Sequence, residues 1–154
     1  MNICEQAEAY RLLLQMGMVE KSEVISWADG IIVTQDRVPD WLLDVSLAEN
    51  EETSAIESRL RDLPGEWSRL GAAYAALDRF AEEFQIKGRF TSRSAADMLQ
   101  VWADSIKGNE KDWREAMLPG WIADEVPFGN ATDQQVVDLI DACIAYFAAA
   151  RKVG

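Results

Sequence analysis

Carboxylates are the side chains whose number and spacing in this sequence could support chemistry. Asp and Glu occupy 27 of 154 positions, and histidine is absent. Without histidine the chain lacks the usual general base near neutral pH, Ser–His and Cys–His nucleophile pairs, and the commonest zinc and haem ligand. Glycine-rich phosphate-binding motifs are missing as well. The remaining route to an enzyme is Mg²⁺ held by acidic residues three positions apart on facing helices, because this ion prefers oxygen ligands.

Acidic residues with this i,i+3 spacing occur throughout the chain, as Glu5/Glu8, Glu20/Glu23, Glu49/Glu52, Asp112/Glu115 and Asp138/Asp141. Composition alone produces about five such pairs by chance, so the spacing does not single out a metal site. We therefore predict no catalytic residue, no metal and no cofactor. An all-α, Mg²⁺-dependent nucleotide hydrolase remains the alternative, with Glu5/Glu8 and Asp138/Asp141 as its first candidate ligands.

The two cysteines, Cys4 and Cys143, stand alone without C-x-x-C spacing. Isolated thiols in apolar helical segments are usually small buried side chains of proteins kept in a reducing compartment. We predict that both are free and that neither is catalytic.

The start of the sequence lacks a basic segment followed by an apolar run, because Glu5 and Glu8 interrupt it, and no apolar run anywhere reaches 18 residues. This pattern predicts a cytoplasmic protein without export signal or membrane span.

The negative charge is unevenly distributed along the chain. The net charge is −12, and residues 1–56 hold eleven acids and three bases, a balance of −8. Direct nucleic-acid binding is disfavoured, because phosphate neutralisation needs clustered Lys and Arg. The acidity serves either solubility alone or a surface that faces a basic partner. Under the second interpretation the predicted partner-binding residues are Trp41 as aromatic anchor and Asp29, Asp36, Asp40, Asp44, Glu49, Glu51 and Glu52.

The residue pattern predicts an all-α fold, a single-domain helical bundle of about seven helices spanning residues 1–154. Its centre is a helix at 66–84, in which one face recurs at three- and four-residue steps. The residues expected to face the core are Trp67, Leu70, Tyr74, Leu77, Ala81 and Phe84. On the same helix, Glu82 and Glu83 are expected to face water. A short extended piece at Gly30–Thr34 is the one place where strand is expected.

Local signals predict where several other helices begin and end. Gly17 is a natural C-cap for a first helix, and Thr132-x-x-Gln135 is a capping box for the last one. Pro119–Gly120 predicts the end of a short helix at 110–118, followed by an irregular connection at 121–131. The only basic cluster lies in a turn at 85–93. If the acidic surface serves solubility alone, that turn and the 121–131 connection are the expected interface.

The segment from Trp27-Ala28-Asp29 through Pro39-Asp40-Trp41-Leu42-Leu43-Asp44-Val45-Ser46-Leu47 resembles small acidic all-α immunity proteins of bacterial toxin–immunity systems, including contact-dependent inhibition and polymorphic toxins. The resemblance implies a non-catalytic protein that neutralises a basic, cytoplasm-acting toxin by one-to-one binding. Because a toxin that acts on nucleic acid must be basic where it binds phosphate, a nuclease is one class of target. An adaptor or scaffold subunit is a further alternative to this reading.

Overall fold

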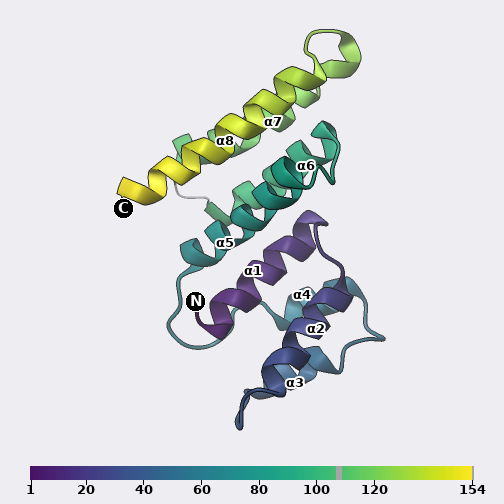
Figure 1. Ribbon diagram of the computed structural model, residues 1–154, viewed down its shortest axis with the longest axis vertical. Helices are drawn as coiled ribbons and strands as arrows, with labels where there is room; N and C mark the ends of the chain where they lie inside the picture. Colours follow the sequence, from purple (N-terminus) through teal and green to yellow (C-terminus); the bar gives the residue numbers. More distant parts are fainter. Residues whose placement is uncertain (107–108, 154) are drawn as a thin grey trace. The chain divides into compact units, whose positions relative to one another are not determined.

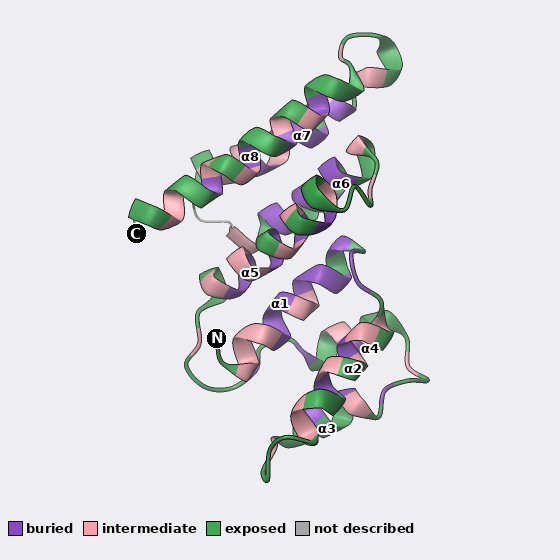
Figure 2. Ribbon diagram, viewed as in Figure 1, coloured by how far each residue is buried: buried purple, intermediate pink, exposed green. Residues whose placement is uncertain are grey.

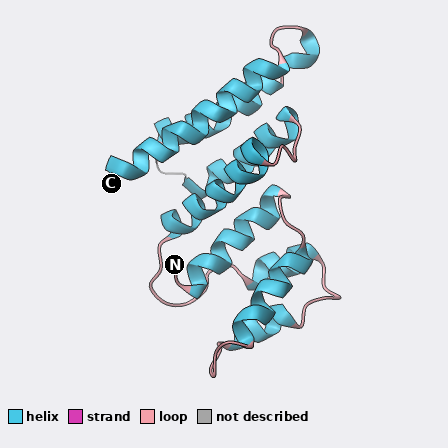
Figure 3. Cartoon of the chain, in the orientation of Figure 1, coloured by secondary structure: helices cyan, strands magenta, loops and turns pink. Residues whose placement is uncertain are grey.

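The computed structural model describes residues 1–106 and 109–153, and throughout these ranges the chain is built from helices and loops (Figure 1 and Figure 3). The all-α prediction is confirmed: the described residues form eight α-helices, where about seven were expected, and they contain no strand. The segment Gly30–Thr34, where an extended piece was expected, continues a helix through Ile32 and then forms a turn at Val33–Thr34. The chain divides into two compact units, Met1–Ala72 and a second unit from Ala73 onward.

The first unit contains α1 (Ile3–Met16), α2 (Lys21–Ile32), α3 (Asp40–Ser46) and α4 (Thr53–Arg59). The predicted C-cap is confirmed, because Gly17 adopts a φ of +76° and its amide donates to the Leu14 carbonyl. Helix α2 packs on α3, and α4 packs on both α1 and α3. The fully buried side chains of α2, α3 and α4 are Val24, Ala28, Leu42, Val45 and Ile56.

The segment that follows α4 is tied back to the start of α1. The Asn2 side chain accepts from the Glu5 amide as an N-cap and donates to the Glu66 carbonyl, 3.3 Å away. The carboxylate of Glu5 accepts from the Ser68 amide at 2.9 Å, immediately before α5 (Arg69–Ala81) begins. These bonds satisfy backbone groups that a helix terminus would otherwise leave unpaired.

The second unit contains most of α5, the π-helical turn η1 (Glu82–Ile86), α6 (Ser92–Ala103), the 3₁₀ turn η2 (Asp104–Ile106), α7 (Glu110–Ala123), the 3₁₀ turn η3 (Val126–Phe128) and α8 (Asp133–Val153). Helices α6, α7 and α8 pack against one another pairwise. The Trp102 indole is fully buried in this core. Its N–H donates to the Ala73 carbonyl at 2.8 Å, and its ring packs edge-on against Phe147 with 4.9 Å between centroids.

The buried face of the predicted central helix differs from the expected one. Leu77 is buried as predicted, but Leu70 is 51% exposed, and the other four residues of the expected stripe are only half-buried. The face that is buried carries Ala72, Ala73, Ala76, Leu77, Phe80 and Glu83 (Figure 2). Glu83, which was expected to face water, is 1% exposed. Its carboxylate is tolerated there because three cationic side chains bind it.

The predicted helix end at Pro119–Gly120 is wrong, because α7 runs through both residues to Ala123. A proline inside a helix removes one backbone hydrogen bond. Here Pro119 and Gly120 are both buried, and packing against α6 outweighs that loss. A Cβ at position 120 would lie 2.0 Å from the Gln100 amide nitrogen, so the glycine makes room for this side chain. The irregular connection therefore starts after α7, and η3 lies within it.

None of the helices in the described ranges combines the length and the apolar character that crossing a bilayer requires.

Candidate protein-binding face on α3

Helix α3 is short, and its sequence places apolar residues on two opposite sides. Leu42 and Val45 are fully buried against the rest of the first unit. The residues at the 40, 43, 44 and 47 positions follow the i, i+3, i+4, i+7 spacing that keeps side chains on one helix face. We call this the α3 outer face, made of Asp40, Leu43, Asp44 and Leu47.

The α3 outer face presents leucines to solvent between carboxylates. Leu47, the C-cap of α3, is 83% exposed, and Leu43 is 39% exposed. Asp40 and Asp44 are both exposed beside them. Single exposed leucines are ordinary in proteins. Two leucines on one face of a seven-residue helix, each next to an acid, form a surface that is both apolar and negatively charged.

The negative charge of this face is only slightly compensated. Asp40 has no ion-pair partner among the residues that the structure describes. Asp44 lies 3.9 Å from the Arg59 guanidinium, at the limit of an ion pair. Arg59 binds Glu51 more closely, with 2.8 Å between Nε and the carboxylate, and this hydrogen bond lowers the pKa of Glu51. Because Arg59 lies closer to Glu51, it offsets the negative charge of Asp44 only weakly.

The other predicted partner-binding residues divide into unpaired and engaged acids. Asp36, in the turn before α3, and Glu49 and Glu52, before α4, are exposed and have no ion-pair partner in the described ranges. Lys21 holds this last loop in place, since its ammonium group donates to the backbone carbonyls of Glu49 and Glu51. Asp29 is exposed on α2, and its carboxylate accepts a hydrogen bond from the Ser46 hydroxyl.

Trp41, the predicted aromatic anchor, belongs to a half-buried aromatic cluster. Its ring stacks on Trp27 with 6.5 Å between centroids, and Trp27 in turn meets Tyr10 at 5.1 Å. The Trp27 indole donates to the Gln6 side chain at 2.9 Å. The cluster holds Trp41 in one orientation, so any partner meets only the part of its ring that remains exposed.

The carboxylate pairs of the enzyme alternative bind protein donors. Glu8 is buried and accepts two hydrogen bonds from Arg11, at 2.6 and 2.7 Å. In the last helix, Asp138 accepts from Gln134, and Asp141 accepts from Gln85. Within the described residues no three His, Cys, Asp or Glu side chains come together as a metal site.

A second charged cluster surrounds Glu83 in the second unit. Its carboxylate accepts from Arg89 at 2.9 Å, from Lys87 at 3.1 Å and from Arg79 at 3.0 Å. Hydrogen bonds from these three cations, that of Arg89 foremost, lower the pKa of Glu83 from 4.5 to about 2, although burial opposes the shift. The buried Glu83 carboxylate thus neutralises part of the positive charge of the basic turn predicted at 85–93. Arg93, at its end, pairs with Asp97 and Asp124.

Sequence reasoning selected the acids around α3 but missed Leu43 and Leu47. The signal was present, because the stretch Trp41–Leu47 has apolar residues on every side of a short helix, and a helix packed on one side cannot bury them all. No protein-family model, no curated protein and no solved structure matches the chain.

Proposed function

We propose that this chain is a non-catalytic binding protein for a basic protein partner, and that the partner docks on the α3 outer face. The observation that carries the proposal is the alternation of two carboxylates with two exposed leucines on the side of α3 opposite Leu42 and Val45. Carboxylates attract a cationic partner over distance, whereas leucines stabilise the complex once water has left. Burying one leucine fully contributes about 1.5–3 kcal/mol.

The partner surface that fits this face has Lys or Arg residues interleaved with apolar side chains. Exposed acids without an ion-pair partner extend the negative surface beyond α3, at Asp36, Glu49 and Glu52. The segment that resembles immunity proteins includes the whole of α3. We therefore propose the more specific role of an immunity protein, which neutralises a basic toxin acting in the cytoplasm by covering it in a one-to-one complex. The toxin-like product of a neighbouring gene is the first partner to test.

The experiment is an equilibrium titration of the partner with matched variants. Leu47→Ser removes an apolar side chain from the α3 outer face, and Ile86→Ser removes one that is equally exposed, at 80%, in the second unit. We expect Leu47→Ser to weaken binding at least tenfold and Ile86→Ser to leave it unchanged. Equal effects of the two variants, or no effect of either, would rule out α3 as the docking site.

The charge contribution needs its own pair of variants. Asp40→Lys reverses an acid of the α3 outer face, whereas Asp104→Lys reverses an exposed acid in η2 of the second unit. Both change the net charge by the same amount, so a general electrostatic effect would be shared. We expect only Asp40→Lys to weaken binding at low salt.

No contact among the described residues specifically favours the Mg²⁺-dependent hydrolase. A rise in unfolding temperature with Mg²⁺, above that produced by NaCl at equal ionic strength, would favour it over a binding protein.

A further inference from the structure

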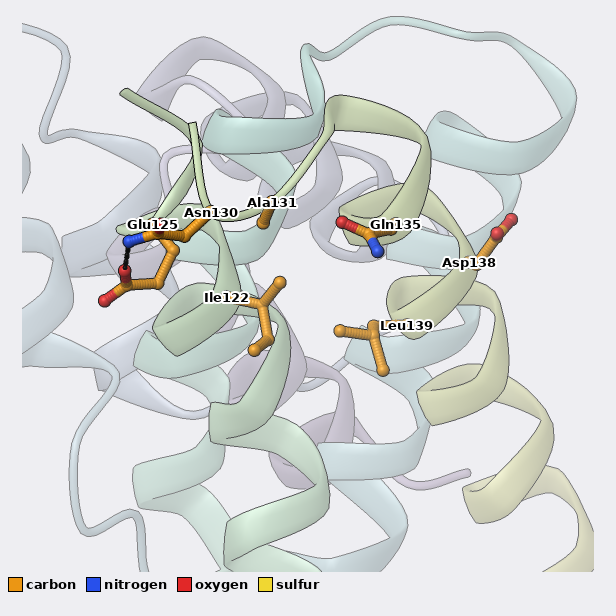
Figure 4. Close-up of a pocket in the computed structure, with 7 residues that line it drawn as sticks. All are labelled: Ile122, Glu125, Asn130, Ala131, Gln135, Asp138 and Leu139. Atoms are coloured by element: carbon orange, nitrogen blue, oxygen red, sulfur yellow. Dashed lines mark hydrogen bonds between the residues drawn. The ribbon is translucent and has the colours of Figure 1, made fainter. Parts of the chain in front are cut away.

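A preformed pocket opens at the end of the second unit, between the last turn of α7 and the first turns of α8 (Figure 4). Its volume is about 360 Å³. The apolar walls are Ile122 from α7 and Leu139 from α8, which face each other across the opening, with Ala131 between the helices. The remaining lining residues are polar: Glu125, Asn130, Gln135 and Asp138.

Local hydrogen bonds hold the pocket in shape without a ligand. The predicted capping box is confirmed, since the Thr132 amide donates to Gln135 Oε1 at 2.8 Å and the Gln135 amide donates to Thr132 Oγ1 at 3.2 Å. Gly129 turns the chain with a φ of +76°. Asn130 can then bind Glu125 twice, through its backbone amide to the Glu125 carbonyl and through its side-chain amide to the carboxylate.

The polar groups at the two ends of the pocket keep hydrogen-bonding capacity. Gln135 uses its carbonyl in the capping box, which leaves its side-chain NH₂ as a donor pointing toward the opening. Asn130 uses its NH₂ on Glu125, which leaves its carbonyl oxygen as an acceptor. At the edges, Glu125 and Asp138 have no cation within ion-pairing distance among the described residues. The pocket thus offers an apolar centre, an amide donor and acceptor, and negative charge.

We infer that this pocket binds an extended basic peptide segment of another protein, which inserts one apolar side chain between Ile122 and Leu139. The volume accommodates a leucine or phenylalanine side chain. The free amide groups of Gln135 and Asn130 match the C=O and N–H groups of a peptide backbone. Lys or Arg on either side of the inserted residue would lie near Glu125 and Asp138.

A second copy of this chain is a poorer occupant. The connection that borders the pocket also exposes Phe128, the side chain that a second copy would offer. A symmetric contact would bring the Glu125 and Asp138 carboxylates of both copies together, and each copy carries a net charge of −12. Like charges at such a contact oppose it.

The test uses methyl-labelled protein and short synthetic peptides observed by NMR. The probes are Gly-Lys-Leu-Lys-Gly, Gly-Lys-Phe-Lys-Gly, Gly-Lys-Ser-Lys-Gly and Gly-Glu-Leu-Glu-Gly, each blocked at both ends. We expect the first two to shift the Ile122 and Leu139 methyl resonances at millimolar concentration. The serine peptide should cause no saturable shift, and the acidic peptide should bind at least tenfold more weakly.

Three variants separate binding in the pocket from binding elsewhere. Leu139→Asp should abolish the shift at Ile122, whereas Ala145→Asp, at an exposed position on the same helix, should preserve it. Because Leu139→Asp can disturb packing, the third variant reverses the edge charge: Glu125→Lys/Asp138→Lys should reverse the preference, so that Gly-Glu-Leu-Glu-Gly binds better than the lysine peptide. Loss of folding alone cannot produce this reversal.

Three results would overturn the inference. One is that no peptide shifts the Ile122 and Leu139 methyl resonances, and another is that the serine peptide shifts them as strongly as the leucine peptide. The third is a shift that follows protein concentration without peptide and disappears in Phe128→Ser, which would assign the pocket to a second copy. The pocket and the α3 outer face lie in different units and are tested with different variants, so failure of one leaves the other standing.

Discussion

Replacing Glu83 with glutamine removes one negative charge from a buried site while keeping the shape of the side chain. The three cations around it, Arg89, Lys87 and Arg79, would then lie close together without their shared carboxylate. A pKa lowered from 4.5 to about 2 corresponds to about 3 kcal/mol of preference for the folded, ionised state. Since Lys87 and Arg89 are about half exposed, solvent screening reduces this contribution. We expect Glu83→Gln to lower the free energy of unfolding by about 1–3 kcal/mol at pH 7.

The stability that the Glu83 carboxylate contributes depends on pH. The pKa of Glu83 is lower in the folded than in the unfolded chain, so its contribution is complete above pH 4.5 and is lost as the pH falls toward about 2. The difference between wild type and Glu83→Gln should therefore shrink over that range. The matched control is Glu82→Gln, whose exposed carboxylate lies 3.8 Å from Lys87 and should contribute no more than about 0.5 kcal/mol.

The assay is urea unfolding followed by tryptophan fluorescence at several pH values. If Glu83→Gln costs no more than Glu82→Gln at pH 7, the buried cluster does not stabilise the fold. A cost that stays constant down to pH 2 would show instead that the loss comes from packing and not from charge.

Three further predictions concern the two cysteines, one tyrosine and the apolar side chains of α5 and α8. Burial raises the pKa of the Cys143 thiol to about 12, and the nearby Glu115 carboxylate adds to the shift. Burial also raises the pKa of the Cys4 thiol. Mass spectrometry after alkylation of native protein at pH 8 should therefore show Cys143 unmodified and Cys4 reacting more slowly than free cysteine. The phenol of Tyr146 donates to the Asp112 carboxylate at 2.5 Å, and this hydrogen bond raises the pKa of Tyr146 to about 12. Ultraviolet titration should therefore find Tyr146 ionising at lower pH in Asp112→Asn. Leu77→Ala and Ile140→Ala should each cost about 2–5 kcal/mol of unfolding free energy, whereas Leu70→Ala, at a half-exposed position, should cost less than about 1 kcal/mol; equal costs at Leu70 and Leu77 would contradict the observed buried face.

Signals that act within a few residues predicted the structure well. Gly17 ends α1, and the Thr132-x-x-Gln135 box begins α8, because each motif satisfies the backbone groups of its own helix end. The helical class follows from periodicity in the same way. The existence of the helices and the ends marked by these two capping motifs depend on neighbouring residues, so they can be inferred from local sequence.

Features that depend on how side chains pack in the folded chain were predicted less well. Apolar spacing alone could not place Glu83 inside, because its burial depends on Arg89 and Lys87 from the turn after η1. Likewise, the breaking tendency of Pro119 was outweighed by packing of α7 on α6. The candidate site shows the same limit: charge selected Asp40 and Asp44, but only the packed α3 reveals which leucines remain outside.

The most direct measurement of the central claim is the pair of rate constants for partner binding at low and high salt. Reversing Asp40 and Asp44 to lysine should slow association at low salt, and the effect should fade near 1 M salt, where the Debye length falls to about 3 Å. Leu47→Ser should instead speed dissociation about tenfold to a hundredfold at either salt concentration, the range that losing about 1.5–3 kcal/mol of leucine burial produces. Wild-type association by the charge-reversed protein at low salt, together with wild-type dissociation by Leu47→Ser, would show that the α3 outer face does not bind the partner.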